Sequence, residues 1–451
     1  MKLKTLVTTL LIGSSPIAAL AAQPSPSNAE IGVPGPRNCL FSHGPVSGDP
    51  YVNAAYPDSA TAYWAAIFST PEGASLTLKG QFPHSRYISF ISYDEKGVPV
   101  ESVADYLIKP EAGSSNPYLP GAVRDSTQRD YRLNVLNQAK TDQEVIGQAQ
   151  ADGQGRPLHA PTNKNGQQVV LYRIYAADQG LHPTGGAPLP EPVLTLKDGS
   201  VLEGQAACKA LKAAQFPRLA VAAVGMPKSQ YLALLKQPGK PDTHPAQETP
   251  EWHIQLDRDS LIGIYTGKIN PNARRSEGGF FPNLDNQYIR TIVNNRFGDV
   301  LVIRGKAPTT PKTVRGDKSM GSGELRYWSM CSNQGFANAR VNDCVHDENV
   351  PLDPQGYYTI MVSKAKDRPR VAHTECGIAW LPIADDGDGV KDPDVAVVQL
   401  RNMLAAPDFK HGVNSVNKDS DIAAVMGEYA PKGTYLQRNI IESVWTCPQK
   451  P

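Results

Sequence analysis

The 451-residue chain lacks an excess of charge of either sign. Its 45 lysines and arginines stand against 44 aspartates and glutamates, so the formal net charge is +1. Proteins that bind nucleic acid or an anionic membrane through their overall field carry a marked basic excess. We therefore expect neither kind of partner.

Long apolar runs are also missing. The two longest, residues 6–12 and residues 219–226, are far shorter than the roughly 20 residues that cross a bilayer. The first run follows Lys2 and Lys4 and precedes the small residues 19–21, an order typical of a cleaved export signal, with an uncleaved anchor helix as the alternative. We expect residues 1–21 to be removed, no membrane anchor, and a secreted or periplasmic protein.

Common catalytic signatures are absent. There is no G-x-S-x-G, no glycine loop of the kind that binds phosphate, and no C-x-x-C. Residues 363–366 match S-x-x-K without the partner motifs of that family. The sequence therefore assigns no reaction, and whether the protein is an enzyme stays open.

Cysteine is scarce but even in number. An even count in an oxidising compartment favours disulfides, and six cysteines allow fifteen connectivities. We predict one pair, Cys331 with Cys344, because closing the Asn- and Gly-containing loop between them would restrain an insertion. The six are Cys39, Cys208, Cys331, Cys344, Cys376 and Cys447.

An internal repeat is the most informative feature that is present. Residues 56–80 align without a gap to residues 281–305 at an offset of 225. The match resumes at an offset of 240, where residues 86–89 meet residues 326–329. Further on, Val103 and Asp105 align with Val341 and Asp343. Such self-similarity predicts a duplicated structural unit.

Both copies are expected to consist mainly of strands. Alternation of polar and apolar residues or short apolar runs predict strands over residues 75–79, 87–93, 131–136, 169–176, 300–303, 325–331, 357–363 and 378–381. Four-residue spacing of apolar side chains predicts helices that begin near residues 58 and 283, and others over 205–216, 228–236, 395–405 and 419–426.

We therefore predict a mainly β (α+β) protein with two duplicated domains of the β-sandwich or jelly-roll kind. The expected segments are an extended arm over 22–50, a first β domain over 51–204, a helical connector and proline-rich loop over 205–275, and a second β domain with C-terminal helices over 276–451.

Several short motifs resemble those of a known group. Tyr358, Ile360, Pro369, the Trp-Leu-Pro within residues 379–382 and Arg401 stand in the second half, and residues 427–435 follow them. In the first half, residues 171–175 and 185–190 are similar to a strand and turn of the same group. The chain thus resembles secreted bacterial proteins built from paired domains of unknown function. That resemblance implies export and a two-domain β architecture, and no reaction.

An acidic stretch at residues 385–394 indicates a possible cation site. Alternating Asp and Gly lets a tight loop direct carboxylates at one centre, which suits calcium. Asp386, Asp388 and Asp392 fall at positions three, five and nine of a calcium loop, but Ala384 and Val395 occupy positions one and twelve. A less regular calcium loop and a solvated acidic turn are both compatible with this pattern.

A second group combines imidazole with carboxylate. His346, Asp347 and Glu348 are consecutive, and His373 follows in the same half. Such residues can hold zinc and supply a general base, although their spacing matches no established motif. A loop braced by the neighbouring cysteines is the alternative.

The repeated pairs Arg86-Tyr87 and Arg326-Tyr327 are candidates for ligand grooves, in which Arg would bind an anion and Tyr would stack on a ring. Tyrosines of the core with arginines lying along the sheet are the alternative.

Our leading hypothesis is an exported, monomeric or weakly associating protein that acts as a binding or surface-interaction protein, with a carbohydrate or other small polar ligand held between its two units. The rival hypothesis is a metal-dependent extracellular hydrolase that uses the His346 group.

Overall fold

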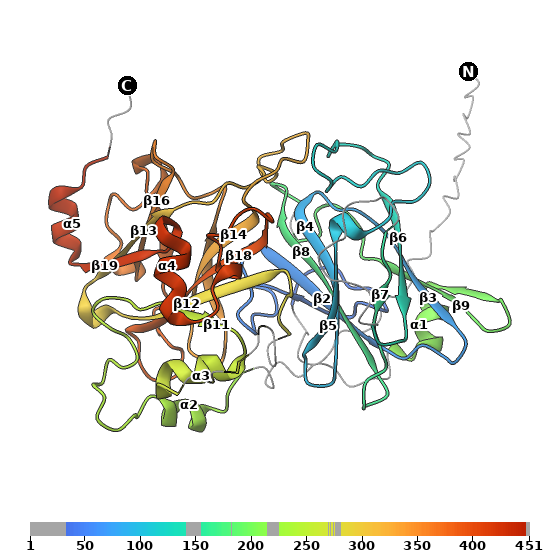
Figure 1. Cartoon of the computed structure of the whole chain (residues 1–451), viewed down its shortest axis with the longest axis horizontal. Coiled ribbons are helices and arrows are strands. Elements are labelled where there is room, and N and C mark those ends of the chain that lie inside the picture. The colour runs from blue at the N-terminus through green and yellow to red at the C-terminus, as the bar shows by residue number, and fades with distance from the viewer. Residues whose placement is uncertain are drawn as a thin grey trace, which may run out of the picture.

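The computed structural model describes residues 33–140, 155–181, 183–213, 225–268, 281–447 and positions 270, 272, 273 and 275. Two β-rich bodies lie side by side, the first half blue to green and the second mainly yellow to red (Figure 1). Three disulfides join Cys39 to Cys208, Cys331 to Cys344 and Cys376 to Cys447.

Two five-stranded sheets make up the first half. One has the order β1 (His43–Val46), β2 (Thr61–Phe68), β8 (Gln168–Ala177), β4 (Ser85–Tyr93) and β5 (Pro99–Ala104). The other has the order β10 (Val201–Glu203), β9 (Glu191–Thr195), β3 (Ser75–Gln81), β6 (Asp130–Leu136) and β7 (Leu158–His159).

The second half repeats this arrangement with one strand fewer. Its first sheet has the order β11 (His253–Gln255), β12 (Asn286–Asn294), β18 (Val395–Ala405), β14 (Leu325–Asn333) and β15 (Val341–His346). Its second sheet has the order β17 (Ala379–Pro382), β16 (Tyr357–Ser363), β13 (Val300–Lys306) and β19 (Lys432–Leu436). The predicted mainly β, sandwich-type layout in two bodies is confirmed.

Segments that align in sequence occupy equivalent places in the two halves. The pairs β2 and β12, β3 and β13, and β4 and β14 begin at the offsets of 225 and 240 found in the sequence. In each half, one edge pair is parallel, β6 with β7 and β16 with β17. That the two halves arose by duplication remains a prediction.

The sheets β1-β2-β8-β4-β5 and β11-β12-β18-β14-β15 are buried on both faces at their centres. One face of the first contributes Trp64, Phe90 and Tyr172 to the core of its own half. The opposite face places Tyr87 and Tyr175 in an apolar cluster that also contains Tyr327 and Met403 of the second half. These two sheets therefore supply the contact between the halves.

Three segments predicted as helices are instead strands of these two doubly buried sheets. Residues 61–68, 286–294 and 395–405 form the strands β2, β12 and β18. A strand with both faces buried has no polar face, so its apolar residues show no period of two and can fall at helical spacing by chance.

Helices are short and lie at the margins of the sheets. Helices overlap the predicted ranges 205–216, 228–236 and 419–426, as α1 (Gly204–Ala210), α2 (Lys228–Leu234) and α4 (Ile422–Met426). Two more were not predicted: α3 (Arg258–Thr266), whose start is capped by Asp257 and Ser260, and α5 (Arg438–Val444). None of the helices in the described ranges is long and apolar enough to cross a membrane.

Candidate ligand-binding site

Arg86, predicted to line a ligand groove, is instead a buried link between the halves. Its side chain is fully buried, and its Nη1 donates to Asp347 Oδ2 at 2.6 Å while Nη2 donates to Glu348 Oε1. Burial on its own would raise the pKa of Asp347, but the Arg86 charge together with contributions from His346 and Thr310 outweighs it, and the pKa falls to about 2. Arg86, on β4, is thus held by two acids that follow β15, and it cannot serve a ligand without breaking these pairs.

Arg326 makes the reciprocal contact from the second half. Its Nη1 lies 3.3 Å from Asp105 Oδ1 of the first half. The Asp105 carboxyl is fully buried, and burial raises its pKa to about 6 although the Arg326 charge opposes this. The two ion pairs therefore occupy equivalent places in the two halves. The pKa of the acid is lowered in one pair, at Asp347, and raised in the other, at Asp105.

Strand register also corrects the sequence alignment at this point. Ser89 pairs with Ala104, and the equivalent Ser329 pairs with His346. Asp105 therefore corresponds to Asp347, four residues beyond the Asp343 indicated by the sequence alignment. The loop between β14 and β15 differs in length from the equivalent loop between β4 and β5. This difference shifted the sequence alignment away from the structural one.

The repeated tyrosines also lie at the contact between the halves rather than in a groove. Tyr87 Oη donates to Asp285 Oδ2 of the second half. Tyr327 Oη donates to Asp58 Oδ2 of the first half at 3.0 Å. Both tyrosines are buried, which matches the alternative of core tyrosines.

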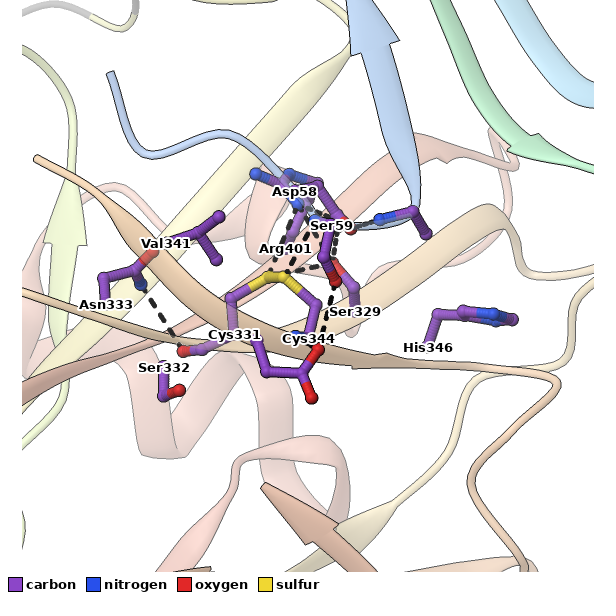
Figure 2. Close-up of a disulfide and its surroundings, with 12 residues drawn as sticks. Asp58, Ser59, Ser329, Cys331, Ser332, Asn333, Val341, Cys344, His346 and Arg401 are labelled. Atoms are coloured by element: carbon purple, nitrogen blue, oxygen red, sulfur yellow. Dashed lines mark hydrogen bonds and ion pairs between the residues drawn. A yellow bond between two sulfur atoms is a disulfide. The ribbon is translucent and has the colours of Figure 1, made fainter. Parts of the chain in front are cut away.

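Asp58 is the centre of a second buried link. Its Oδ2 accepts hydrogen bonds from Arg401 Nη1 and from Ser329 Oγ, the latter at 2.6 Å. Figure 2 shows these three side chains grouped beside the disulfide between Cys331 and Cys344, the pair expected from the sequence. The side chains of Asp58, Ser329 and Arg401 are all almost fully buried, so this group holds the two halves in one geometry.

A cavity of about 120 Å³ lies between the halves next to this link. Equivalent positions of both central sheets line it: Tyr63 and Arg173 form a cross-strand pair in the first half, as Tyr288 and Arg401 do in the second. Each arginine lies over the ring of its tyrosine, at 5.3 Å and 5.2 Å. Other lining residues include His43, Trp64, Tyr56, Tyr175, Gln255, Phe281 and Asn283.

The two walls of this cavity differ in chemistry. The cross-strand pair Ala65 and Leu171 lines the wall of the first half. The equivalent pair in the second half is Arg290 and Gln399. At this pair of positions the first wall is therefore apolar and the second polar, although the backbone arrangement is the same.

Arg290 has the least compensated charge at the cavity. Its guanidinium lies 4.3 Å from the centre of the Tyr56 ring, and among the described residues it makes no ion pair with a carboxylate. Burial lowers the pKa of Arg290 to about 10, and the neighbouring Arg401 acts in the same direction. A buried cation in this state favours an anion beside it.

The predicted zinc group does not converge. Asp347 and Glu348 pair with Arg86, and Figure 2 shows His346 apart from the disulfide group. His373 lies instead beside the disulfide of Cys376 and Cys447. In the described ranges, no set of three His, Cys, Asp or Glu donor atoms within 4.8 Å of one another joins His346, Asp347 or Glu348 to His373.

The acidic loop uses its carboxylates within the chain. Asp388 is buried, and its Oδ1 accepts from the backbone N–H groups of residues 390, 391 and 392 at 2.7–3.0 Å. Its Oδ2 accepts from Tyr231 Oη at 3.1 Å. Asp386 accepts from Gln334 Nε2, and Asp392 accepts from the N–H of Asp394. Calcium binding at this loop remains a prediction.

Sequence analysis did not single out Arg173, Arg290 or Arg401 as parts of one site. Their signal was a lone arginine inside an otherwise apolar strand, as in residues 168–177. Such an arginine is buried together with its strand, so it marks either an internal ion pair or a ligand.

No protein-family model matches the chain, and no curated protein matches it either. Among solved structures, the chain is similar to an uncharacterised protein from Burkholderia cenocepacia, at 10% identity and a TM-score of 0.43, over 84% of this chain and 77% of the other. It is also similar to a protein from Vibrio parahaemolyticus, at 12% identity and a TM-score of 0.36, over 84% of this chain and 90% of the other. These two structures assign no activity to the chain.

Proposed function

We propose that this protein is an exported binding protein that holds a carbohydrate or other small polar ligand in the cavity between its two halves. The observation that carries the proposal is the cavity itself, which is lined from both halves by aromatic rings and a few polar groups. Ligand sites commonly have this composition and commonly lie between structural units.

Export is supported by the three disulfides, since such bonds persist mainly in oxidising compartments. The resemblance to secreted bacterial proteins with paired domains supports the same location. The partial exposure of Tyr63, Gln255, Phe281 and Tyr288 favours access of a ligand to the cavity from solvent.

The test is cavity filling. Ala65→Leu adds three carbons to the cavity wall, whereas Ala424→Leu adds the same atoms to an exposed position of α4. Native mass spectrometry of the protein isolated from an oxidising compartment, and melting temperatures against sugars and small polar metabolites, would report binding. We expect a bound compound in the wild type and in Ala424→Leu that Ala65→Leu loses. Equal binding by all three proteins would place the ligand elsewhere and refute the proposal.

A further inference from the structure

The charges around the cavity are unbalanced. Among the described residues, Arg173, Arg290 and Arg401 line it, and no aspartate or glutamate does. Asp58 pairs with Arg401. Asp285, whose carboxylate accepts from Tyr87 and Ser102, feels the charge of Arg173. Even when both acids are counted, three cations face two carboxylates.

Each of the three arginines also has a buried N–H group that no protein acceptor satisfies. Across the described residues, the unpartnered atoms include Arg173 Nη1, Arg290 Nε and Arg401 Nε. All three residues are at most 3% exposed. Leaving a buried donor unsatisfied costs about 1–3 kcal/mol. Three such donors on residues around one cavity would be satisfied by a ligand with several acceptor lone pairs.

The contrast between the walls predicts how such a ligand would lie. Arg290 and Gln399 stand where the first half has Ala65 and Leu171. An acceptor group would face Arg290, and an apolar part would face Ala65, Leu171 and Trp64. A cavity of about 120 Å³ is comparable with the engineered cavity of about 150 Å³ that binds benzene, so the enclosed part is about the size of one ring.

From this we infer that the ligand is a small amphipathic anion, with a carboxylate or phosphate group bound by Arg290 together with Arg173 and Arg401, and an apolar body against the wall of the first half. A guanidinium fork binds both oxyanions through two parallel N–H bonds. The inference rests on the proposed function and narrows its ligand from small polar molecules to anionic ones.

The test compares charged and neutral probes of one shape. Benzoate and benzamide differ in charge, phenyl phosphate replaces the carboxylate, and inorganic phosphate lacks the apolar body. We expect benzoate or phenyl phosphate to bind the wild-type full chain with a Kd of 1 mM or better. That affinity requires a binding free energy of less than about 0.5 kcal/mol per non-hydrogen atom of the probe. At 10 mM the melting temperature should rise by roughly 1–2 °C. Benzamide and inorganic phosphate should bind at least tenfold more weakly.

Variants assign the effect to the arginine. Arg290→Ala introduces the residue type found at the equivalent position of the first half, Ala65. It should weaken binding of the anionic probe at least tenfold. Arg290→Lys keeps the charge without the fork and should retain part of the affinity. Melting temperatures of the unliganded variants show whether each remains folded.

The outcomes separate the two proposals. If benzamide binds as tightly as benzoate and Ala65→Leu abolishes both, the cavity is a ligand site but the anionic inference is wrong. If no anionic probe binds with a Kd below 10 mM, the inference is also overturned. The same holds if Arg290→Ala leaves the affinity for the anionic probe unchanged. If Ala65→Leu leaves all binding intact, the proposed function itself fails.

Discussion

Arg86 and Arg326 each donate a hydrogen bond to the backbone carbonyl oxygen of the other, at 3.1 Å and 3.3 Å. The two residues occupy equivalent positions of β4 and β14, so the contact between the halves has approximate two-fold symmetry here. The ion-pair partners do not follow this symmetry, because Arg86 binds two carboxylates and Arg326 binds one.

The first prediction concerns this asymmetry. Arg86→Ala should lower the free energy of unfolding by about 3–5 kcal/mol, because it leaves Asp347 and Glu348 buried without their cation. Arg326→Ala should cost less, about 1–2 kcal/mol, because Asp105 can take up a proton instead. Urea unfolding of both variants at pH 7 measures the difference. An equal or larger loss in Arg326→Ala would contradict this assignment of roles.

The second prediction concerns pH. The pKa of Asp105 in the folded protein, about 6, lies above its ordinary value of 3.8. Its contribution to stability is therefore fully present below about pH 4 and is lost as the pH rises through 6. At 1.36 kcal/mol per pH unit the loss amounts to about 3 kcal/mol.

Asp105→Asn removes this titration. The stability of the wild type minus that of the variant, measured by urea unfolding between pH 4 and pH 7.5, should fall by that amount as the pH rises. Asp347 does not interfere, because its pKa of about 2 confines its effect to pH values below about 4. A difference that stays constant across the range would show that Asp105 is not the titrating group.

The third prediction compares two Asp–Arg pairs between the halves. Asp58→Asn removes the charge that faces buried Arg401 and should cost about 2–4 kcal/mol. Asp49→Asn is the matched control, because Asp49 and Arg340 also form a pair between the halves at 2.7 Å but both are exposed. The control should cost less than about 1 kcal/mol. Thermal or urea unfolding of the two variants tests the ranking, which a similar loss in both would refute.

The fourth prediction concerns the acidic loop. Asp388→Ala removes the acceptor of three backbone N–H groups and of Tyr231, so we expect a loss of about 2–4 kcal/mol in buffer containing EDTA. Asp386→Ala, at an exposed position, should cost less than about 1 kcal/mol.

Calcium binding is tested on the same proteins. If the loop takes calcium, calcium chloride should raise the melting temperature of the wild type, and Asp386→Ala should reduce that rise. If Asp388→Ala is as stable as the wild type in EDTA, the loop does not depend on this carboxylate.

Local sequence patterns predicted strands well where one face of the strand meets a core. The alternation in residues 75–79 predicted β3, and residues 357–363 form β16 as expected. Among the strands of the two sheets between the halves, which are buried on both faces, apolar runs predicted β4, β8 and β14, whereas β2, β12 and β18 were predicted as helices because their apolar residues also fall at helical spacing. A contact between distant parts of the chain thus removed the polar face on which the pattern depends.

The candidate site shows a similar limit. The repeated Arg-Tyr pairs were recognised, but their sequence could not distinguish a groove from a buried ion pair, because the partners of Arg86 are 261 and 262 residues away. Arg173, Arg290 and Arg401 were not grouped, since they meet only when β8, β12 and β18 line one cavity.

The amino-acid pattern alone determined the mainly β class, the correspondence of the two halves and the local pair Cys331 and Cys344, because these depend on periodicity and on neighbours within a few residues or at a constant offset. Tertiary structure alone decided which arginines are neutralised and which are left with unsatisfied N–H groups. Burial and the nearness of a counter-charge set that balance, and both arise only when the two central sheets face each other.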